Sequence, residues 1–454
     1  MSDVIILGGG ISGLASAYFL SKKGLSSTIV EAAPRLGGLI RTDTVRGCQL
    51  EAGPDSYIST KPEATRLAHE VSGLGNEIIG TNDAARRIFV VRNGTLVPFP
   101  AGMVLMAPGN MRAVLESELF SNSTKCALLR ERFYKPRERE QDISVAEFVT
   151  DHFDSSILEY VTEPLLTGVY GGEAAKLSAR SVLPRFLEYE RTYGSLVRAV
   201  RKERKNAAAN NSSLFLSFRR GMQSLPDGLA RAAAASITSV HGEATAVEKR
   251  SGRWAVTIGR SIADAKFLIM ALPAHRAAPL FEKSFPALAG ELSAIPYTSA
   301  ISVNLVFDRS SVERPLDGFG FLVPRSERRQ IAAATWINTK FPERVAQGFV
   351  ALRAFIVDRD ADTLHPESNE TIVGVARAEF QRLMGINASP VASVVARWPL
   401  SMPQYVVGHA ASCRRIRALT AQESGLFLVG NAYEGVGIPD CIRLAQQAVA
   451  QIDA

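Results

Sequence analysis

The chain has 454 residues, of which 46% are hydrophobic, so an ordered globular protein of two or three interleaved domains is expected. No stretch of about 20 apolar residues lacks charge, so no segment is expected to span a membrane. The cysteines (Cys48, Cys126, Cys413 and Cys441) are too scattered for a disulfide framework, a structural zinc site or a redox dithiol, and no metal site is expected. A net charge of +7 suits an anionic substrate, an anionic lipid surface or ordinary solubility.

The first forty residues have the pattern of a dinucleotide-binding βαβ unit. A strand at 4–7 leads into a glycine-rich turn and an apolar helical stretch, and a second strand at 28–30 ends in Glu31. Gly8 allows the tight turn, Gly10 lets the backbone approach a diphosphate, and Gly13 lets the helix pack on the strand. A carboxylate at Glu31 can accept both ribose hydroxyls of an adenosine. The predicted contacts are Gly8, Gly10, Ile11, Ser12, Gly13, Glu31 and Ala32.

A second glycine pair distinguishes between dinucleotides. Arg35-Leu36-Gly37-Gly38 resembles the second diphosphate-contacting element of flavoproteins of the glutathione-reductase and amine-oxidase type, which NAD dehydrogenases usually lack. FAD binds in an extended, buried form, so Gly37 and Gly38 would let the backbone come close while Arg35 offsets diphosphate charge. The sequence therefore favours FAD over NAD.

The middle of the chain is less regular. It holds a short strand at 88–91, an apolar, proline-bounded segment at 98–108 and a helical stretch at 144–165. Residues 198–211, rich in Arg, Lys, Asn, Ala and Ser, are the predicted flexible linker. Strands at 254–258 and 267–272 are expected to return to the dinucleotide domain. Strands at 299–307 and 348–357 would form a second sheet, covered on one side by a charged helix at 367–384.

The C-terminal segment carries a second strong signal. A strand and tight turn at 425–431 precede a glycine-rich stretch and a terminal helix at 442–452. Pro439 suits a first helical turn, because its missing N–H would have no intrahelical partner there. A helix N-terminus aimed at a cofactor stabilises the negative charge that a reduced flavin gains at its N1/C2 carbonyl edge. The predicted flavin contacts are Gly430, Asn431, Val436, Gly437 and Ile438.

With both ends considered, the chain resembles the oxygen-dependent protoporphyrinogen oxidases, FAD enzymes of haem synthesis, over nearly its whole length. The motifs that carry the resemblance are Glu51–Tyr57, Thr167–Gly172, Gly318–Pro324, Arg397–Pro399 and, most specific, Gly430–Ile442. Amine oxidases share the first motif but usually end with an aromatic pair around the flavin, whereas here Tyr433 alone occupies that stretch. The resemblance implies that six electrons leave the porphyrinogen through FAD to O2, with one peroxide formed per two electrons.

The resemblance also implies particular site residues. Further FAD contacts would be Gly53, Pro54, Asp55, Ser56, Val247 and Trp398. The macrocycle would lie over an apolar wall formed by Leu165, Gly168, Phe319, Gly320, Leu322 and Thr335. A substrate propionate would pair with Arg87, or with Arg86, because the alignment is ambiguous by one residue. No side chain is assigned as catalytic, since flavin N5 would carry the chemistry, and His409 is expected to be structural.

The predicted fold is α/β. A doubly wound FAD-binding domain of the glutathione-reductase and amine-oxidase type would comprise 1–83, 214–280 and 395–454, with a mixed-sheet substrate domain at 281–394. A largely helical insertion at 84–213 is expected to face a membrane, because its apolar segment 98–107 accompanies many basic residues. Those basic residues are Arg112, Lys125, Arg130, Arg132, Lys135, Arg137 and Arg139.

Several functional alternatives stay open. Protoporphyrinogen IX is favoured as substrate over coproporphyrinogen III, which carries two extra propionates. Another flavin amine oxidase or desaturase, and a non-catalytic binding protein with the dinucleotide fold, are the competing hypotheses. A homodimer and an anionic membrane surface are candidate partners, and nucleic acid is not. Because three residues precede the first strand, no signal peptide is expected, which predicts a cytoplasmic or peripheral membrane location.

Overall fold

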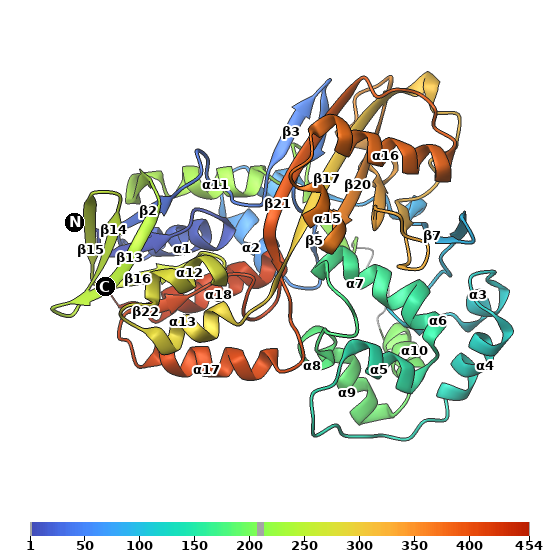
Figure 1. The fold of residues 1–454 in the computed structure, drawn as a ribbon, viewed down its shortest axis with the longest axis horizontal. Coiled ribbons are helices and arrows are strands. Elements are labelled where there is room, and N and C mark those ends of the chain that lie inside the picture. The colour runs from blue at the N-terminus through green and yellow to red at the C-terminus, as the bar shows by residue number, and fades with distance from the viewer. Residues whose placement is uncertain (1, 207–212, 454) are drawn as a thin grey trace.

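A five-stranded parallel sheet carries the N-terminal βαβ unit in the computed structural model, which describes residues 2–206 and 213–453 (Figure 1). Its strands lie in the order β12 (Ile237–His241), β2 (Ser27–Glu31), β1 (Val4–Leu7), β16 (Phe267–Met270) and β22 (Leu426–Leu428). Every neighbouring pair is parallel. Parallel sheets are usually covered on both faces, which explains why β1 and β16 are wholly apolar. The predicted doubly wound α/β fold is confirmed.

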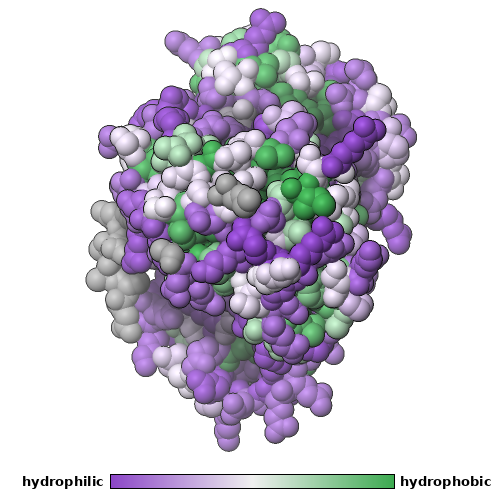
Figure 2. Space-filling view, turned by 90° about the vertical axis from the view of Figure 1, so that its left-hand side faces the viewer, coloured by the Kyte–Doolittle hydropathy of each residue, from purple (hydrophilic) through white to green (hydrophobic). Residues whose placement is uncertain are grey.

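The two faces of this sheet are buried by different elements because successive side chains of a strand point to opposite sides. Val4 and Ile6 belong to a core that they share with α1 (Ile11–Lys22), α2 (Glu63–Glu70), α11 (Ser224–Ala232) and α18 (Ile438–Ala450). Ile5 and Leu7 lie in another core with α12 (Ala274–Phe281), α13 (Pro286–Ser293), α17 (His409–Ala421) and a small antiparallel sheet. That sheet consists of β13 (Ala244–Arg250), β14 (Arg253–Ile258) and β15 (Ser261–Ala265). At this end of the molecule, hydrophilic side chains surround separate apolar spots (Figure 2).

Short strands complete this half of the molecule. β3 (Thr42–Val45) and β4 (Cys48–Glu51) form a hairpin. β5 (Tyr57–Ile58), β11 (Phe215–Phe218) and β6 (Ile78–Gly80) form a three-stranded sheet. The segment between β4 and β5, which holds several predicted FAD contacts, is therefore fixed by strands at both of its ends.

A second sheet has seven strands and is mixed. The order is β21 (Ala392–Pro403), β17 (Tyr297–Asp308), β20 (Phe349–Val357), β19 (Ala333–Trp336), β18 (Gly320–Leu322), β7 (Ile88–Arg92) and β8 (Thr95–Pro98). β18 and β7 run parallel, and the other neighbours are antiparallel. α15 (Asp358–Leu364) packs on this sheet through Ala361 and Leu364, and α16 (Asn369–Met384) packs on it through Ile372 and Phe380 (Figure 1). The predicted mixed sheet is confirmed.

The strand pairing crosses two of the predicted domain boundaries. β7 and β8 lie within the predicted insertion of 84–213, yet β7 pairs with β18 of the seven-stranded sheet. The predicted boundary at 395 falls inside β21, which pairs with β17 from Ala392 to Pro403. A division that follows the pairing gives β7, β8 and the whole of β21 to the substrate domain.

Residues 111–206, here called the helical unit, are mainly α-helical and share one core. Its helices are α3 (Met111–Glu116), α4 (Asn122–Glu131), α5 (Val145–His152), α6 (Ser155–Ile157), α7 (Glu163–Tyr170), α8 (Ala179–Val182), α9 (Pro184–Tyr193) and α10 (Leu196–Asn206). The predicted linker at 198–211 is wrong in its first part, because α10 continues to Asn206 and buries Val197 and Val200 on one face. Residues 207–211 lie outside the described residues.

The apolar segment that was expected at a membrane forms a hairpin of β9 (Met103–Val104) and β10 (Ala107–Pro108). Met106 and Ala107 are fully buried, and Val104 and Leu105 are half-buried against the core of the helical unit. Within residues 2–206 and 213–453, no helix has the length and apolar character needed to cross a bilayer. The hairpin thus offers fewer free apolar side chains to a membrane than its sequence indicates.

Candidate active site

The two predicted glycine elements meet at the carboxyl end of β1. Gly10 and Gly37 form a β-bridge, and a Cβ added at Gly10 would meet one heavy atom within 4 Å, the Cα of Gly38 at 3.9 Å. A Cβ at Gly13 would lie 2.0 Å from the carbonyl oxygen of Gly8, so close packing of α1 on the turn requires glycine there, as predicted. Open glycine backbone beside a helix N-terminus fits the diphosphate of FAD. Ile11 and Ser12 form the first turn of that helix.

Glu31 ends β2 with its carboxylate bound to neighbouring backbone. Oε2 accepts a hydrogen bond from the N–H of Gly9 at 2.7 Å, and Oε1 accepts one from the N–H of Ala33 at 2.8 Å. Glu31 and Ala32 therefore lie directly beside the glycine turn, where the adenosine ribose is expected. Each carboxylate oxygen has a further lone pair that can accept a hydrogen bond from a ribose hydroxyl.

Arg35 binds its own loop rather than projecting freely. Its Nη1 donates to the carbonyl oxygens of Leu36 and Ile40, both at 3.0 Å, and its Nη2 donates to that of Gly38 at 2.5 Å. These hydrogen bonds hold the Gly37–Gly38 turn in shape. Arg35 therefore stabilises this turn, a role beyond the expected one of offsetting diphosphate charge.

Two of the predicted FAD contacts in the segment 51–56, Gly53 and Asp55, make close contacts with other parts of the protein. A Cβ at Gly53 would lie 1.8 Å from the carbonyl oxygen of Leu39, so glycine is required for chain packing. Asp55 accepts hydrogen bonds from Lys340 Nζ at 2.7 Å and from Ser56 Oγ at 2.7 Å. Burial alone would raise the pKa of Asp55, but Lys340, Arg353 and Ser56 outweigh it and hold this pKa well below its usual range. Asp55 is therefore a carboxylate paired with a cation of α14 (Ile337–Lys340), the short helix that follows strand β19 of the seven-stranded sheet.

The C-terminal glycine loop is fixed by Tyr405. The hydroxyl of Tyr405 donates to the carbonyl oxygen of Asn431 at 2.7 Å and accepts from the N–H of Gly435 at 2.9 Å. A Cβ at Gly430 would meet no atom within 4 Å, so this end of the loop is open. Val436 packs on the core of the helical unit, and Gly437 caps α18.

The terminal helix begins earlier than predicted. α18 starts at Ile438 rather than at 442, with Pro439 in its first turn. A thirteen-residue helix therefore directs its N-terminus at the glycine loop. Buried Asp440 lies under this loop and pairs with Lys61 at 2.6 Å, a contact that the sequence did not reveal.

The remaining predicted FAD residues lie on strands. Val247 is buried in β13 within the core shared with α12 and α13. Trp398 of β21 donates from Nε1 to the carbonyl oxygen of Ala52 at 2.7 Å, and the guanidinium of Arg41 lies 5.8 Å from the centre of its ring. Trp398 thus joins the seven-stranded sheet to the segment 51–56.

Predicted substrate residues from three distant segments meet on neighbouring strands. Gly320 of β18 pairs with Thr335 of β19 on one side and with Ile88 of β7 on the other. The N–H of Phe319 donates to the carbonyl oxygen of Arg87 at 2.7 Å. A Cβ at Gly320 would lie 2.0 Å from the carbonyl oxygen of Ala334, so close strand approach requires glycine.

The side chains of this wall differ in exposure. Phe319 is 8% exposed and belongs mostly to the core, whereas Leu322 and Thr335 are half-buried.

Leu165 and Gly168 lie on one face of α7, three residues apart. Gly168 is exposed, a Cβ there would meet nothing within 4 Å, and the neighbouring Val169 is 51% exposed. A π-helical turn at Leu158–Thr162 precedes α7, and such turns often occur at functional sites. At its other end, the carbonyl oxygen of Tyr170 accepts a hydrogen bond from Gln404, which follows β21. An open apolar helix face is thus anchored to the seven-stranded sheet.

Arg87 is paired within the protein. Its Nη1 lies 2.5 Å from Asp317 Oδ2, and both side chains are about half exposed. Arg86, Arg87 and Asp317 line a hollow of about 680 Å³ whose other wall is the apolar segment 97–101. A substrate carboxylate would have to share Arg87 with Asp317 or displace it. Arg86 opens into the same hollow and stays an alternative.

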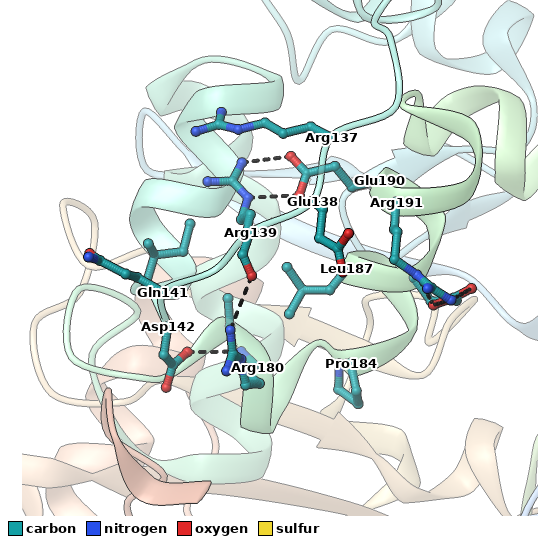
Figure 3. A pocket seen from close by; sticks show the side chains of 13 residues that line it. Arg137, Glu138, Arg139, Gln141, Asp142, Arg180, Pro184, Leu187, Glu190 and Arg191 are labelled. Carbon is teal, nitrogen blue, oxygen red and sulfur yellow. Dashed lines mark hydrogen bonds and ion pairs between the residues drawn. The ribbon is translucent and has the colours of Figure 1, made fainter. Parts of the chain in front are cut away.

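A smaller hollow of about 250 Å³ lies in the helical unit and is lined by four arginines (Figure 3). Arg139 forms a two-pronged pair with Glu190, at 2.7 Å from each nitrogen, and Arg180 donates to the carbonyl oxygens of Arg139 and Glu140. Both arginines are therefore used to hold the loop 137–143, and none of the predicted site residues lines this hollow.

His409 has the surroundings of a structural residue, as expected. Its ring stacks on Tyr405 with centroids 4.0 Å apart, and Nε2 lies 3.3 Å from the carbonyl oxygen of Tyr433. Burial lowers the pKa of His409. It supports the glycine loop from behind, through Tyr405.

Comparison with known proteins agrees with this geometry. Residues 11–453 match the family described as flavin containing amine oxidoreductase. The chain belongs to this family. It is 32% identical to the coproporphyrinogen III oxidase of Bacillus subtilis, over 99% of this chain and 98% of the relative. It is 30% identical to the protoporphyrinogen oxidase of Homo sapiens, with 99% and 98% covered.

A crystal structure from Exiguobacterium sp. 255-15, named as a candidate protoporphyrinogen oxidase, has a TM-score of 0.88 at 29% identity. It covers 98% of this chain, and this chain covers 97% of it. The chain is therefore an FAD-dependent oxidase, and the predicted cofactor is confirmed. The open glycine backbone at Gly10 and Gly430 fits that cofactor, and Gly38 packs closely on Gly10 beside it.

Proposed function

We propose that the chain oxidises a porphyrinogen to the corresponding porphyrin. The observation that carries this proposal is the full-length similarity to a bacterial and a human enzyme whose names state such an activity. The gathering of Arg87, Phe319, Gly320 and Thr335 on adjacent strands supports it, because an apolar wall edged by a cation suits a flat macrocycle with carboxylate arms.

Coproporphyrinogen III is the substrate that we place first. The bacterial relative reported above is a coproporphyrinogen III oxidase and is slightly more similar to this chain than the human protoporphyrinogen oxidase is. Protoporphyrinogen IX, the substrate favoured from the sequence, is the second candidate and is supported by that human relative. The two substrates share the meso carbons that react and differ in the number of propionates, so a single site can be tested with both.

In this proposal, the FAD-holding residues form three groups. The diphosphate and adenosine would contact Gly8, Gly10, Ile11, Ser12, Gly13, Glu31, Ala32, Arg35, Gly37 and Gly38. The flavin end would contact Gly430, Asn431, Val436, Gly437 and Ile438. Gly53, Pro54, Asp55, Ser56, Val247 and Trp398 would support the cofactor from the side of the second sheet.

The chemistry requires orientation more than a strong base. FAD supplies a two-electron acceptor at flavin N5 when it is bound. Leu165, Leu322 and the backbone at Gly168 would hold a meso carbon in place and exclude water, and Arg87 would fix the propionate edge. Each two-electron step removes a hydride from a meso carbon and a proton from a pyrrole N–H. Three such steps, followed by a tautomerisation that moves a proton from the fourth meso carbon to a pyrrole nitrogen, give the aromatic ring, and no side chain needs to act as a strong base.

Aerobic turnover tests this proposal. We expect coproporphyrinogen III to yield porphyrin fluorescence with three peroxides per porphyrin, the stoichiometry required if O2 is the acceptor. Putrescine and benzylamine, run as controls, should yield none. Peroxide from the amines together with no porphyrin formed above the non-enzymatic rate would contradict the proposal and favour an amine oxidase.

Peripheral membrane binding is part of the proposal in a modified form. The 98–108 hairpin is largely packed, but Phe133, just after α4, is 80% exposed. Arg130 and Lys135, both exposed, flank it in the sequence. An exposed aromatic ring beside cations is suited to the interface of an anionic bilayer.

A further inference from the structure

Polar side chains of the seven-stranded sheet and of the short helix after β19 bind nearly every residue of the segment 51–55. Asn304 donates to the carbonyl oxygen of Glu51 at 3.0 Å, and Trp398 donates to that of Ala52 at 2.7 Å. The guanidinium of Arg353 donates to the carbonyl oxygen of Gly53. Lys340 Nζ pairs with the Asp55 carboxylate at 2.7 Å. These contacts join residues that are hundreds of positions apart in the sequence.

Of the two cations in this set, Arg353 is buried and Lys340 is largely buried, so each depends on its partners. Arg353 is 3% exposed, and its Nε also donates to Ser302 at 2.9 Å. Lys340 is 14% exposed at its side chain. A buried cation is stabilised only when its hydrogen bonds are complete, and removing one partner leaves an uncompensated charge. The segment 51–55 and the sheet therefore hold each other in one arrangement.

The same cations adjoin the wall expected to carry the substrate. Arg353 of β20 pairs in register with Thr335 of β19, which in turn pairs with Gly320 of β18. Lys340 ends α14 (Ile337–Lys340), the helix that directly follows β19. On its other side, the segment packs at Gly53 against the carbonyl oxygen of Leu39, next to the Gly37–Gly38 turn. The segment thus lies between the substrate wall and the second glycine element.

We infer that Lys340 and Arg353 are positioning residues for the cofactor. They hold Gly53–Asp55 against FAD, Arg353 from the sheet that carries the substrate wall and Lys340 from the helix that follows β19 of that sheet. The spacing between substrate and flavin is therefore set by these two cations. This inference rests on the proposed assignment of Gly53–Ser56 to FAD. It adds to that assignment two residues that neither the motifs nor the resemblance indicated.

The test uses the purified holoenzyme and follows the flavin fluorescence that appears as FAD dissociates after dilution. Lys340→Met removes the charge and keeps the length of the side chain. We expect FAD release about tenfold faster than in the wild type, and Lys340→Arg should restore the slow rate. The control, Arg397→Met, removes a cation of β21 that binds the carbonyl oxygens of His365 and Glu367, and it should change the rate less than twofold.

Release from Lys340→Met within twofold of the wild type would overturn the inference, as would equal acceleration in Arg397→Met. Arg353→Met repeats the test at the second cation. If Arg353→Met does not fold, the result from Lys340→Met decides. The measurement needs no porphyrinogen. If the enzyme does not oxidise a porphyrinogen, the FAD release rates can still show the predicted acceleration. If the release rates show no acceleration, the wild type can still form porphyrin in the aerobic turnover assay.

Discussion

At the scale of single residues, Glu31 is the most direct test of the cofactor site. Its carboxylate already accepts the N–H groups of Gly9 and Ala33, so Glu31→Ala would disturb the turn as well as the ribose contact. Glu31→Gln keeps one acceptor oxygen and removes the charge. We expect both variants to weaken FAD binding, Glu31→Ala by about 1–3 kcal/mol and Glu31→Gln by less, because a charge-assisted hydrogen bond is lost. Equilibrium FAD titration measures this, and full affinity in Glu31→Ala would refute the ribose contact.

Arg87 and Arg86 form a matched pair for testing the propionate anchor. Both line the same hollow, but Arg87 is paired with Asp317 and joined by its backbone to Phe319. We expect Arg87→Ala to raise KM about three- to tenfold with kcat and flavin content nearly unchanged, because a half-exposed ion pair remote from the meso carbon contributes uniform binding. Arg86→Ala should leave KM unchanged. The reverse pattern would move the anchor by one residue, and no effect in either variant would remove it.

At the scale of secondary-structure elements, the helical unit is held by a buried charge cluster around His152. Nδ1 lies 3.0 Å from Glu131 and Nε2 lies 3.2 Å from Glu190, and His152 is 3% exposed. A neutral imidazole donates from one nitrogen only, so donation from both ring nitrogens to carboxylate oxygens requires the charged ring. Glu131 also accepts the N–H groups of Leu196 and Val197 at the start of α10. The cluster therefore joins α4, α5, α9 and α10.

This cluster predicts how stability depends on pH. Burial alone would lower the pKa of His152, but Glu131 and Glu190 outweigh it and raise this pKa above its ordinary value of 6.5. The stabilisation is therefore complete below pH 6.5 and is lost as the pH rises through the folded-state pKa. Burial also opposes ionisation of Glu190, but His152 and Arg139 lower its pKa from 4.5 to about 2, so its contribution is complete above pH 4.5. Stability should be greatest between these limits.

Unfolding at several pH values checks this account. His152→Gln should lower the free energy of unfolding at pH 6 by about 3–5 kcal/mol, because buried Glu131 loses its cationic partner and Glu190 keeps only Arg139. The variant should also show a smaller loss of stability above pH 6.5 than the wild type does. His69→Gln, at an exposed histidine of α2, is the control and should match the wild type. A wild-type stability that rises steadily from pH 6.5 to 9 would contradict the charged ring.

The exposed ring of Phe133 predicts membrane binding by the same helical unit. We expect the protein to co-sediment with vesicles that contain anionic lipid, and added salt should weaken this binding. Phe133→Ser should reduce binding about threefold or more, whereas Val104→Ser should change it little, because Val104 is half-buried in the hairpin. Absence of co-sedimentation at low ionic strength would rule out the membrane contact.

At the scale of the whole molecule, local patterns predicted the parts of the fold that depend on nearby residues. The order of strand, glycine turn, helix and acidic residue over 4–31 needs no distant partner, and the structure has it as β1, α1 and β2. The linker at 198–211 was predicted from composition, yet burial of Val197 and Val200 against the helical unit makes its first part a helix. The start of α18 was placed four residues late, although Pro439 already indicated its first turn.

Contacts between distant segments could not be predicted from local patterns. Asp55 was expected at the cofactor, but its partner Lys340 lies 285 positions away and adjoins no recognisable motif. Arg87 was expected to pair with a substrate propionate, and its partner within the protein, Asp317, lies 230 positions away. Arg87 and Asp317 meet because β7 and β18 pair in one sheet, and Lys340 is placed by the helix that follows β19 of that sheet. Both pairs are therefore a property of the topology rather than of either segment.

The most direct test of the central claim is anaerobic reduction of the bound flavin. Stopped-flow absorbance near 450 nm, about the flavin maximum, would follow the holoenzyme mixed with coproporphyrinogen III, protoporphyrinogen IX or putrescine. We predict rapid, saturable bleaching by a porphyrinogen, fastest with coproporphyrinogen III, and none with putrescine. The account would be contradicted if putrescine bleached the flavin and neither porphyrinogen changed its spectrum.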